Sequence, residues 1–338
     1  MGLDSGQTRP SGIEEEDLID RNLAQKYNFN RQTWIDTCRG IGILLVVLGH
    51  CNPPFCNLIY AFHMPLFFIL SGYLYKERKP VADYGKRMLR RYITPYFILC
   101  FINLLIALIW DRGENFGRYI LGILYSRGTT TWMPNCSPLW FLTGITVALF
   151  LYNLIMYIGN RWLQGLSIVA CVVVSYTLYL LEVPKLPWNF DTALMAITFI
   201  ALGHWLYKRH IHFSSPVYLF YGCIGIVAAY LNPTGVDFDS NEYGNLLWMF
   251  MAGAGISIFL IYMVRRCNPL SRVLNFYGRH TIFIMGFDYF SGRIVGKVVG
   301  CWTFQFVGKV AVLTAGVWLW YYILDRLPQG TWKEVLYI

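Results

Sequence analysis

Two residues near the start of the chain, Arg39 and His50, have the types and the spacing of a pair that handles an anionic cofactor. They are eleven positions apart in a largely apolar run, and eleven steps of about 100° return a side chain to within about 20° of the same helix face. They would lie roughly 16 Å apart along the helix axis. A neutral imidazole can act as a general base and a guanidinium binds phosphates, so this face suits an extended anionic cofactor with a reactive far end.

Both residues also have a structural interpretation. Arg39 fits the band of basic residues at a cytoplasmic membrane surface, and His50 fits a helix end at the membrane interface. Asp36 precedes Arg39 by three positions, which is the spacing of an ion pair on one helix face. From the spacing alone, both interpretations stay open.

A second histidine, His63, is expected to lie near His50. It is about one turn into the next apolar run, and the short connection 52–57 should bring it to a similar depth. Two histidines in one cavity would be suited to proton transfer. A buried histidine with a purely structural hydrogen bond is the alternative. Ser71, further along the same run, fits either a cofactor site or helix packing, where small residues are common.

The segment KRMLRRYITPY, residues 86–96, places three arginines just before another apolar run. Arg87, Arg90 and Arg91 occupy neighbouring helical positions, which suits them to gripping a phosphate-bearing donor. The alternative is a topology anchor that binds lipid headgroups. Asp191, near the start of a later apolar run, is either an ion-paired scaffold residue or part of an acceptor site.

The elements that hold these residues are expected to be membrane helices. Of the 338 residues, 56% are hydrophobic and only 14% are charged, about half the charge of an ordinary soluble domain. Mean hydropathy is +0.43, and a single core of this size cannot hide so much apolar surface from water. The apolar runs lack period-2 alternation, which argues against a transmembrane β-barrel. The composition predicts an all-α integral membrane protein and gives no support to nucleic-acid binding.

Ten apolar runs approach the length needed to cross about 30 Å of hydrocarbon. They are residues 36–51, 58–75, 92–110, 138–158, 166–182, 189–207, 216–231, 245–264, 278–292 and 305–324. A further half-apolar stretch, 116–125, is interrupted by Gly117 and Gly122 and predicts a re-entrant or interfacial helix. With a cytoplasmic N-terminus, 16 basic residues outside the N-terminal tail face the cytoplasm and six face outward, as the positive-inside rule expects.

The predicted organisation is one membrane domain, 34–325, between two cytoplasmic tails. The first tail, 1–33, has no apolar run and is expected to be partly disordered, and the second is 326–338. The nine cysteines are scattered without a CxxC pair, so we interpret them as small core residues, with a disulfide in the outer loops as the less favoured alternative.

In these residues the chain resembles the acyltransferase-3 membrane proteins. The resemblance rests on the D-x-x-R start, on the ten residues between Arg39 and His50, and on five short motifs in the same order, over about residues 33–325. The motifs are FHMPLFFILSG at 62–72, RRYITPY at 90–96, SPLWFL at 137–142, PWNFDTAL at 187–194 and GRHTIFIM at 278–285. The version of the first motif that carries His63 is most similar to the fucose 4-O-acetylase-like branch.

The resemblance implies a ten-span enzyme of a bacterial inner membrane, with both termini in the cytoplasm. Such an enzyme moves an acyl group, usually acetyl, from cytoplasmic acyl-coenzyme A to a carbohydrate hydroxyl. Arg39 and His50 would be its catalytic pair, with His50 as the base, and His63 would orient the acceptor or assist proton transfer. No metal is expected, and the expected partners are acyl-coenzyme A, the carbohydrate acceptor and membrane lipids.

The resemblance also suggests further site residues. The expected donor-binding residues are Arg39, Ser71, Arg87, Arg90 and Arg91. The expected substrate-binding residues are Asp36, Trp140 and Asp191, with Trp140 as a wall of the cavity. Relatives often end the ninth span with a histidine where this chain has Asp288, which leaves the role of that position open. The rival classes are a transporter or flippase for a small polar solute and a non-catalytic scaffold that acts through its tail.

Overall fold

The computed structural model of the protein describes residues 33–76, 80–110, 115–129, 131–133, 135–209, 215–267, 271–296 and 301–326. In these ranges the regular elements are helices, and the β-type pairing is a single isolated bridge between Asp237 and Glu242. The predicted all-α class is therefore confirmed. The two predicted tails lie outside the described ranges, apart from one residue of each.

The described part of the chain begins with a helix at 33–49, which carries Arg39. The helices that follow are α2 (Cys56–Tyr73), α3 (Val81–Met88), α4 (Thr94–Trp110), α5 (Phe116–Tyr125), α6 (Trp140–Met156), α7 (Arg161–Leu180), α8 (Phe190–Arg209), α9 (Ser215–Leu231), α10 (Leu246–Arg266), α11 (Ser271–Arg279), α12 (Thr281–Val295) and α13 (Trp302–Arg326). Three short turns of other helical types precede longer helices. They are the π-helical turn η1 (Leu89–Ile93) before α4 and the 3-10 turns η2 (Ser137–Leu139) and η3 (Pro187–Asn189) before α6 and α8.

Seven helical segments are long and apolar enough to cross a membrane, which identifies a multi-pass membrane protein. Each of the ten predicted spans coincides with a helix. The helix at 33–49, α9 and α12 are not among the seven, so the count of ten stays a prediction. The predicted helix at 116–125 is present with those bounds as α5, and its re-entrant or interfacial placement also stays a prediction.

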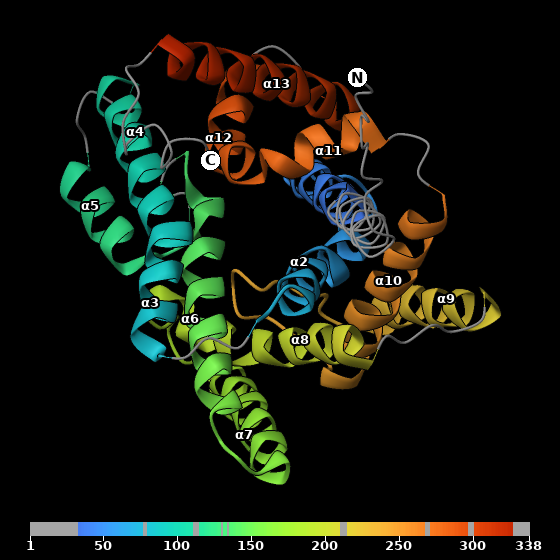
Figure 1. The fold of residues 1–338 in the computed structure, drawn as a ribbon. Coiled ribbons are helices and arrows are strands. Elements are labelled where there is room, and N and C mark those ends of the chain that lie inside the picture. The colour runs from blue at the N-terminus through green and yellow to red at the C-terminus, as the bar shows by residue number, and fades with distance from the viewer. Residues whose placement is uncertain are drawn as a thin grey trace, which may run out of the picture.

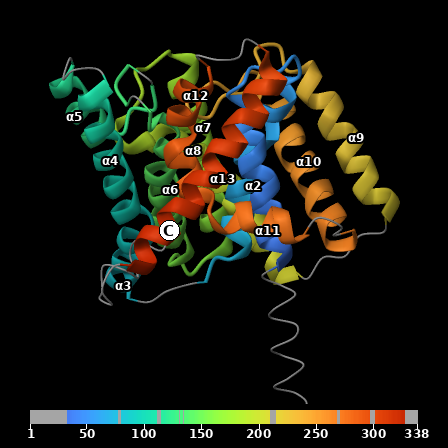
Figure 2. The ribbon, with the colours of Figure 1, turned by 90° about the horizontal axis from the view of Figure 1, so that it is seen from above.

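The long helices run between two ends of the molecule (Figure 2). α3 and α11 lie at one end, which we call the basic end because Arg87 and Arg279 belong to these helices, and α5 lies at the opposite end. Viewed along the bundle, α7 and α9 lie at the periphery and α2 lies inside (Figure 1). The outer side chains of α7 include exposed Trp162 and Leu166, as expected of an apolar helix whose solvent is lipid.

α2 is the central packing element, and most of its residues are buried. It packs against α8 and α10. Gly72 of α2 lies against the backbone of Ile200 on α8, and Gly203 of α8 lies against the backbone of Ile69 on α2, so neither glycine has room for a larger side chain. Small residues of this kind let helices approach closely in lipid, where apolar burial does not drive association between helices.

The helix at 33–49 is held in place by close contacts with α11. Gly40 lies against the backbone of Leu274, and Gly278 lies against the backbone of the helix at 33–49. The hydroxyl of Thr37 donates a hydrogen bond of 2.7 Å to the side-chain oxygen of Asn275. These contacts fix the helix whose residues form the site described next.

Candidate active site

A cavity of about 100 Å³ contains both histidines that the sequence singles out. His50 comes from the end of the helix at 33–49, and His63 from the first half of α2. We call this space the histidine cavity. Its other polar and aromatic side chains are Tyr60, Ser137, Trp140, Phe141, Asp237, Asp239 and Tyr289. The prediction that the two histidines share one cavity is confirmed.

His50 is paired with Asp288 of α12. Its Nδ1 lies 2.5 Å from Oδ2 of Asp288, whose side chain is fully buried. The other carboxylate oxygen, Oδ1, lies 2.7 Å from Nζ of Lys309, a buried residue of α13. An ionised carboxylate only accepts hydrogen bonds, so Nδ1 of His50 carries the proton in this pair. In the neutral ring this leaves Nε2 unprotonated, which is the form a general base needs.

His63 is held by a different contact, within its own helix. Its Nδ1 lies 2.8 Å from the carbonyl oxygen of Ile59 and donates to it. The ring packs edge to face on Tyr60, with 5.0 Å between the centroids, and only 5% of the residue is exposed. A neutral His63 therefore also has Nε2 as its acceptor nitrogen.

A second cavity, of about 200 Å³, lies next to the histidine cavity and contains three arginines. We call it the arginine cavity, and its polar lining includes Arg39, Ser71, Arg91, Tyr92 and Arg279. Phe141 of α6 and Met285 of α12 line both cavities and therefore form the wall between them.

A third space, of about 280 Å³, continues from the arginine cavity. The two share Arg39, Ser71, Arg91 and Tyr92, and the third adds Lys76 and Arg87. We call it the basic vestibule because it collects four cationic side chains. The three spaces form a line from the basic end of the bundle to His50, with Arg39 and His50 on the same helix, as their spacing predicts.

The arginines of the predicted donor cluster separate into two groups. Arg87 and Arg91 line the basic vestibule, but Arg90 is an exposed residue that lines none of these spaces. Arg90 and Arg91 belong to the π-helical turn η1. A π-helical turn changes the angular spacing of successive side chains, and such turns are frequent at functional sites.

Two residues that the sequence assigns to substrate binding have internal partners instead. The carboxylate of Asp36 lies 3.5 Å from Arg39 and 3.5 Å from Arg279, and Asp36 lines none of the three spaces. The predicted ion pair with Arg39 is thus confirmed, and Asp36 positions two guanidinium groups. Asp191 is 1% exposed, and its carboxylate accepts hydrogen bonds from the backbone N–H groups of Leu186 and Thr192 at the start of α8. These are the contacts of a helix-capping residue.

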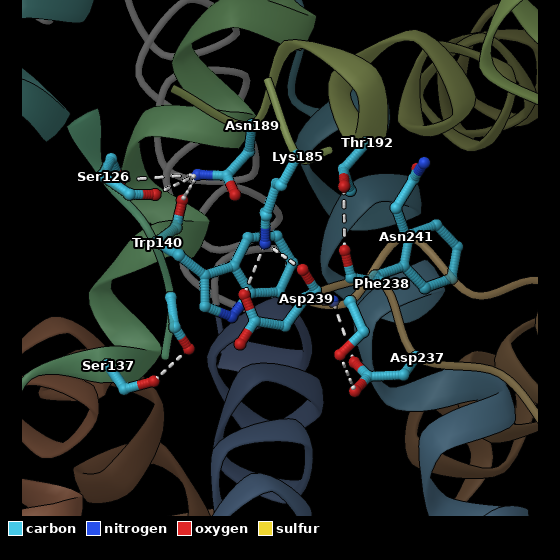
Figure 3. A network of polar contacts seen from close by, with 12 residues as sticks. Ser126, Ser137, Trp140, Lys185, Asn189, Thr192, Asp237, Phe238, Asp239 and Asn241 are labelled. Atoms are coloured by element: carbon cyan, nitrogen blue, oxygen red, sulfur yellow. Dashed lines mark hydrogen bonds and ion pairs between the residues drawn. The ribbon is translucent and has the colours of Figure 1, made fainter. Parts of the chain in front are cut away.

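Trp140, the third residue assigned to substrate binding, does line the histidine cavity. Nζ of Lys185 lies 5.1 Å from the centroid of its ring, and the same ammonium group is ion-paired with Asp239 at 2.6 Å (Figure 3). The indole therefore has one face toward a cation and contributes to the wall of a cavity that also holds carboxylates. This agrees with its predicted place in a cavity wall.

Two charged residues of the site, Asp288 and Lys309, have no catalytic or binding role assigned from the sequence. Asp288 is an acid inside a predicted span, where an ion-paired scaffold residue is one interpretation, and Lys309 has no prediction. Lys309 is a lone cation in the apolar run 305–324, and an intramembrane charge of this kind is a signal that could have found it. Among the described residues, no group of three or more His, Cys, Asp or Glu side chains is arranged to hold a metal ion, and the cysteines are free thiols.

The bundle of membrane helices holds an acid-paired histidine in a carboxylate-containing cavity, and a basic cavity lies next to it. This arrangement is compatible with a group-transfer enzyme. The chain belongs to the acyltransferase-3 family, because residues 32–336 match the family's acyltransferase domain. One relative, "Nodulation protein NolL" of Sinorhizobium fredii (strain NBRC 101917 / NGR234), is 43% identical over 58 residues, which are 13% of this chain and 16% of that protein. No solved structure matches the chain.

Proposed function

We propose that this protein is a membrane O-acyltransferase that moves an acyl group, with acetyl as the expected one, from cytoplasmic acyl-coenzyme A to a hydroxyl of a carbohydrate. The observation that carries the proposal is the pairing of His50 with Asp288 at one end of a line of cavities whose other end is basic. We further assign the chain to the fucose 4-O-acetylase-like branch of the family.

The donor fits this line of cavities in charge and in length. Coenzyme A has a nucleotide end with several phosphates and a long neutral arm that ends in sulfur. Arg39, Arg87 and Arg91 supply guanidinium groups for the phosphates in the basic vestibule. The arm would pass Ser71 in the arginine cavity and bring the thioester to the wall of Phe141 and Met285. His50, on the other side of this wall, lies roughly 16 Å from Arg39 along the helix axis.

The transfer step uses the tautomer that Asp288 imposes. Nε2 of His50 takes the proton of the acceptor hydroxyl while the hydroxyl oxygen bonds to the thioester carbonyl carbon. The tetrahedral intermediate then breaks its bond to sulfur, and the departing thiolate takes the proton back from the imidazolium. Asp288 stabilises the imidazolium between these events, and Lys309 keeps Asp288 ionised. His63 orients the acceptor or assists the proton transfer.

The orientation follows from the charge distribution. The basic end faces the cytoplasm, where acyl-coenzyme A is made, and both termini are cytoplasmic. The carbohydrate reaches the histidine cavity from the other side of the membrane, which in a bacterium is the outer face of the inner membrane. Trp140 forms one wall of this acceptor site.

The test uses the purified protein with radiolabelled acetyl-coenzyme A and a panel of sugars. His50→Ala should lower transfer by at least about a hundredfold, and Arg39→Ala should mainly raise the KM for the donor. His280→Ala is the matched control, because His280 lines none of the three spaces and its Nδ1 donates to the carbonyl of Phe276. Undiminished transfer by His50→Ala would contradict the proposal, and solute movement without thioester consumption would favour a transporter.

A further inference from the structure

The loop between α9 and α10 contributes two carboxylates to the histidine cavity. In residues 236–239 buried and partly exposed side chains alternate. Val236 and Phe238 are buried, whereas Asp237 and Asp239 are partly exposed and line the cavity. Both carboxylates thus lie on the cavity side of the loop, and both apolar side chains lie in the core.

This loop is fixed by several contacts. Asp237 and Glu242 exchange two backbone hydrogen bonds of 2.8 Å each. The hydroxyl of Thr192 on α8 donates a bond of 2.8 Å to the carbonyl oxygen of Phe238 (Figure 3). The side chains of Phe238 and Tyr243 are fully buried. The carboxylates are thus held at defined positions before any ligand binds.

The carboxylates of Asp237 and Asp239 differ in whether a basic side chain neutralises them. Asp239 is neutralised by Lys185, whose Nζ lies 2.6 Å from Oδ1 and also contacts the backbone carbonyl of Asp239. Asp237 accepts hydrogen bonds from the backbone N–H of Asp239, at 2.9 Å, and from the hydroxyl of Ser240, at 3.0 Å. Among the described residues no basic side chain pairs with Asp237. The histidine cavity therefore has an uncompensated negative charge on its loop side.

The rest of the cavity is rich in hydrogen-bond acceptors and aromatic surface. His63 is nine-tenths buried, lines the cavity, and has Nε2 as its free acceptor nitrogen. Tyr60, Trp140 and Tyr289 supply aromatic faces. A sugar ring matches both features, because its hydroxyls donate hydrogen bonds to acceptors and its C–H face packs on aromatic rings. An anionic ring would meet Asp237 at close range in a site with little water.

From this arrangement we infer that the acceptor is an uncharged sugar ring whose hydroxyls next to the reacting one donate hydrogen bonds to Asp237. Trp140 packs against the ring, and rings that carry a carboxylate are rejected. The inference rests on the proposed function, since it concerns the acceptor of that reaction. Asp237 is a residue of substrate specificity, and it takes no part in the proton transfer assigned to His50.

The experiment compares neutral hexosides with the matching hexuronides, each pair differing only by CH2OH against carboxylate, with radiolabelled acetyl-coenzyme A as donor. The wild-type protein should favour the neutral sugar in kcat/KM. In Asp237→Asn this preference should narrow by about ten- to a hundredfold, the scale of one charge-assisted hydrogen bond. Glu242→Gln is the matched control, because Glu242 is an exposed acid of the same loop outside the cavity lining, and it should keep the wild-type ratio.

Two results would overturn the inference: a wild-type preference for the hexuronide, or an unchanged ratio in Asp237→Asn. Absence of transfer to every sugar would count against the proposed function itself. A binding measurement, which does not depend on transfer, therefore tests the inference separately. Sugar binding without donor, followed by tryptophan fluorescence, should show the same neutral preference and the same narrowing in Asp237→Asn. Equal binding of both sugar classes would again overturn it.

Discussion

Nδ1 of His50 lies 2.5 Å from a carboxylate oxygen of Asp288, although 238 residues separate the two in the chain. The contact joins the end of the first described helix to the middle of α12. It decides which nitrogen of the imidazole carries the proton, and the side chain of Asp288 that does so is fully buried. In the proposed mechanism, Asp288 is the residue that orients the base.

Asp288→Asn should therefore reduce catalysis without removing the base. An amide can offer its N–H to Nδ1 and stabilise the wrong tautomer, and it gives no charge to balance the imidazolium. We expect kcat to fall by about 10²- to 10⁴-fold with little change in the donor KM. Steady-state kinetics with acetyl-coenzyme A test this. A kcat close to that of the wild type would show that the pairing is structural only.

Lys309 and Asp288 should be coupled in stability. Removing one partner leaves a buried charge uncompensated, so Lys309→Met and Asp288→Asn should each lower the free energy of unfolding by about 3 kcal/mol or more. The double variant, with Lys309→Met and Asp288→Asn together, should recover most of the lost free energy of unfolding and remain inactive. Thermal unfolding in detergent for all four proteins gives the cycle. Additive losses would contradict the coupling.

Arg91 and Arg90 offer a matched pair for the donor site. They are adjacent in η1, but Arg91 lines the arginine cavity and the basic vestibule whereas Arg90 lines neither. Arg91→Ala should raise the KM for acetyl-coenzyme A by about ten- to a hundredfold, because it removes a charged phosphate partner. Arg90→Ala should change it by less than about fivefold. Equal effects of the two substitutions would mean that the cluster acts only through its overall charge.

Because burial raises the pKa of the loop residue Asp239, we expect the free energy of unfolding of the protein to depend on pH. Burial raises the pKa of its carboxyl from 3.8 to about 6, against the opposing attraction of Lys185. The folded protein then binds this proton more tightly than the unfolded chain does, so the stabilising contribution is complete below about pH 4 and is lost as the pH rises through about 6.

Asp239→Asn removes that titration. The Tm of the variant minus the Tm of the wild type should increase as the pH rises from about 4 to about 7. This difference should level off above about pH 7. Melting curves across this range check the prediction, with Glu242→Gln as a control for an exposed acid of the same loop. A difference in Tm that does not vary with pH would contradict it.

The sequence predicts the helical fold and part of the site. Apolar run length is sufficient to locate helices in a membrane protein, and the spacing of Arg39 and His50 correctly places both along one line of cavities. The sequence does not show which arginines of the cluster 87–91 enter the cavities. Arg90 and Arg91 are adjacent in η1, so their side chains point in different directions, and of these two only Arg91 lines the cavities.

Contacts between distant segments were harder to predict. The pairs His50–Asp288 and Asp36–Arg279 depend on which helix ends meet, and the residues of each pair are more than 200 positions apart in the sequence. Asp191 carried the same polar signal as a ligand-binding acid, but its carboxylate is used by the backbone of its own helix start. Polarity in an apolar segment thus marks a residue that needs a partner, without saying whether the partner is a substrate.

The wall formed by Phe141 and Met285 has an electrical consequence. In the proposed orientation the cavities on its two sides open to compartments that differ in voltage, and moving one elementary charge through 100 mV is worth about 2.3 kcal/mol. A continuous file of water past His50 would let protons flow through the protein and discharge the membrane. The phenyl ring and the thioether at this point have no group that relays protons between the two cavities. A protein with the proposed function has to transfer an acyl group across the bilayer while holding back protons, and Phe141 and Met285 lie where that barrier is needed.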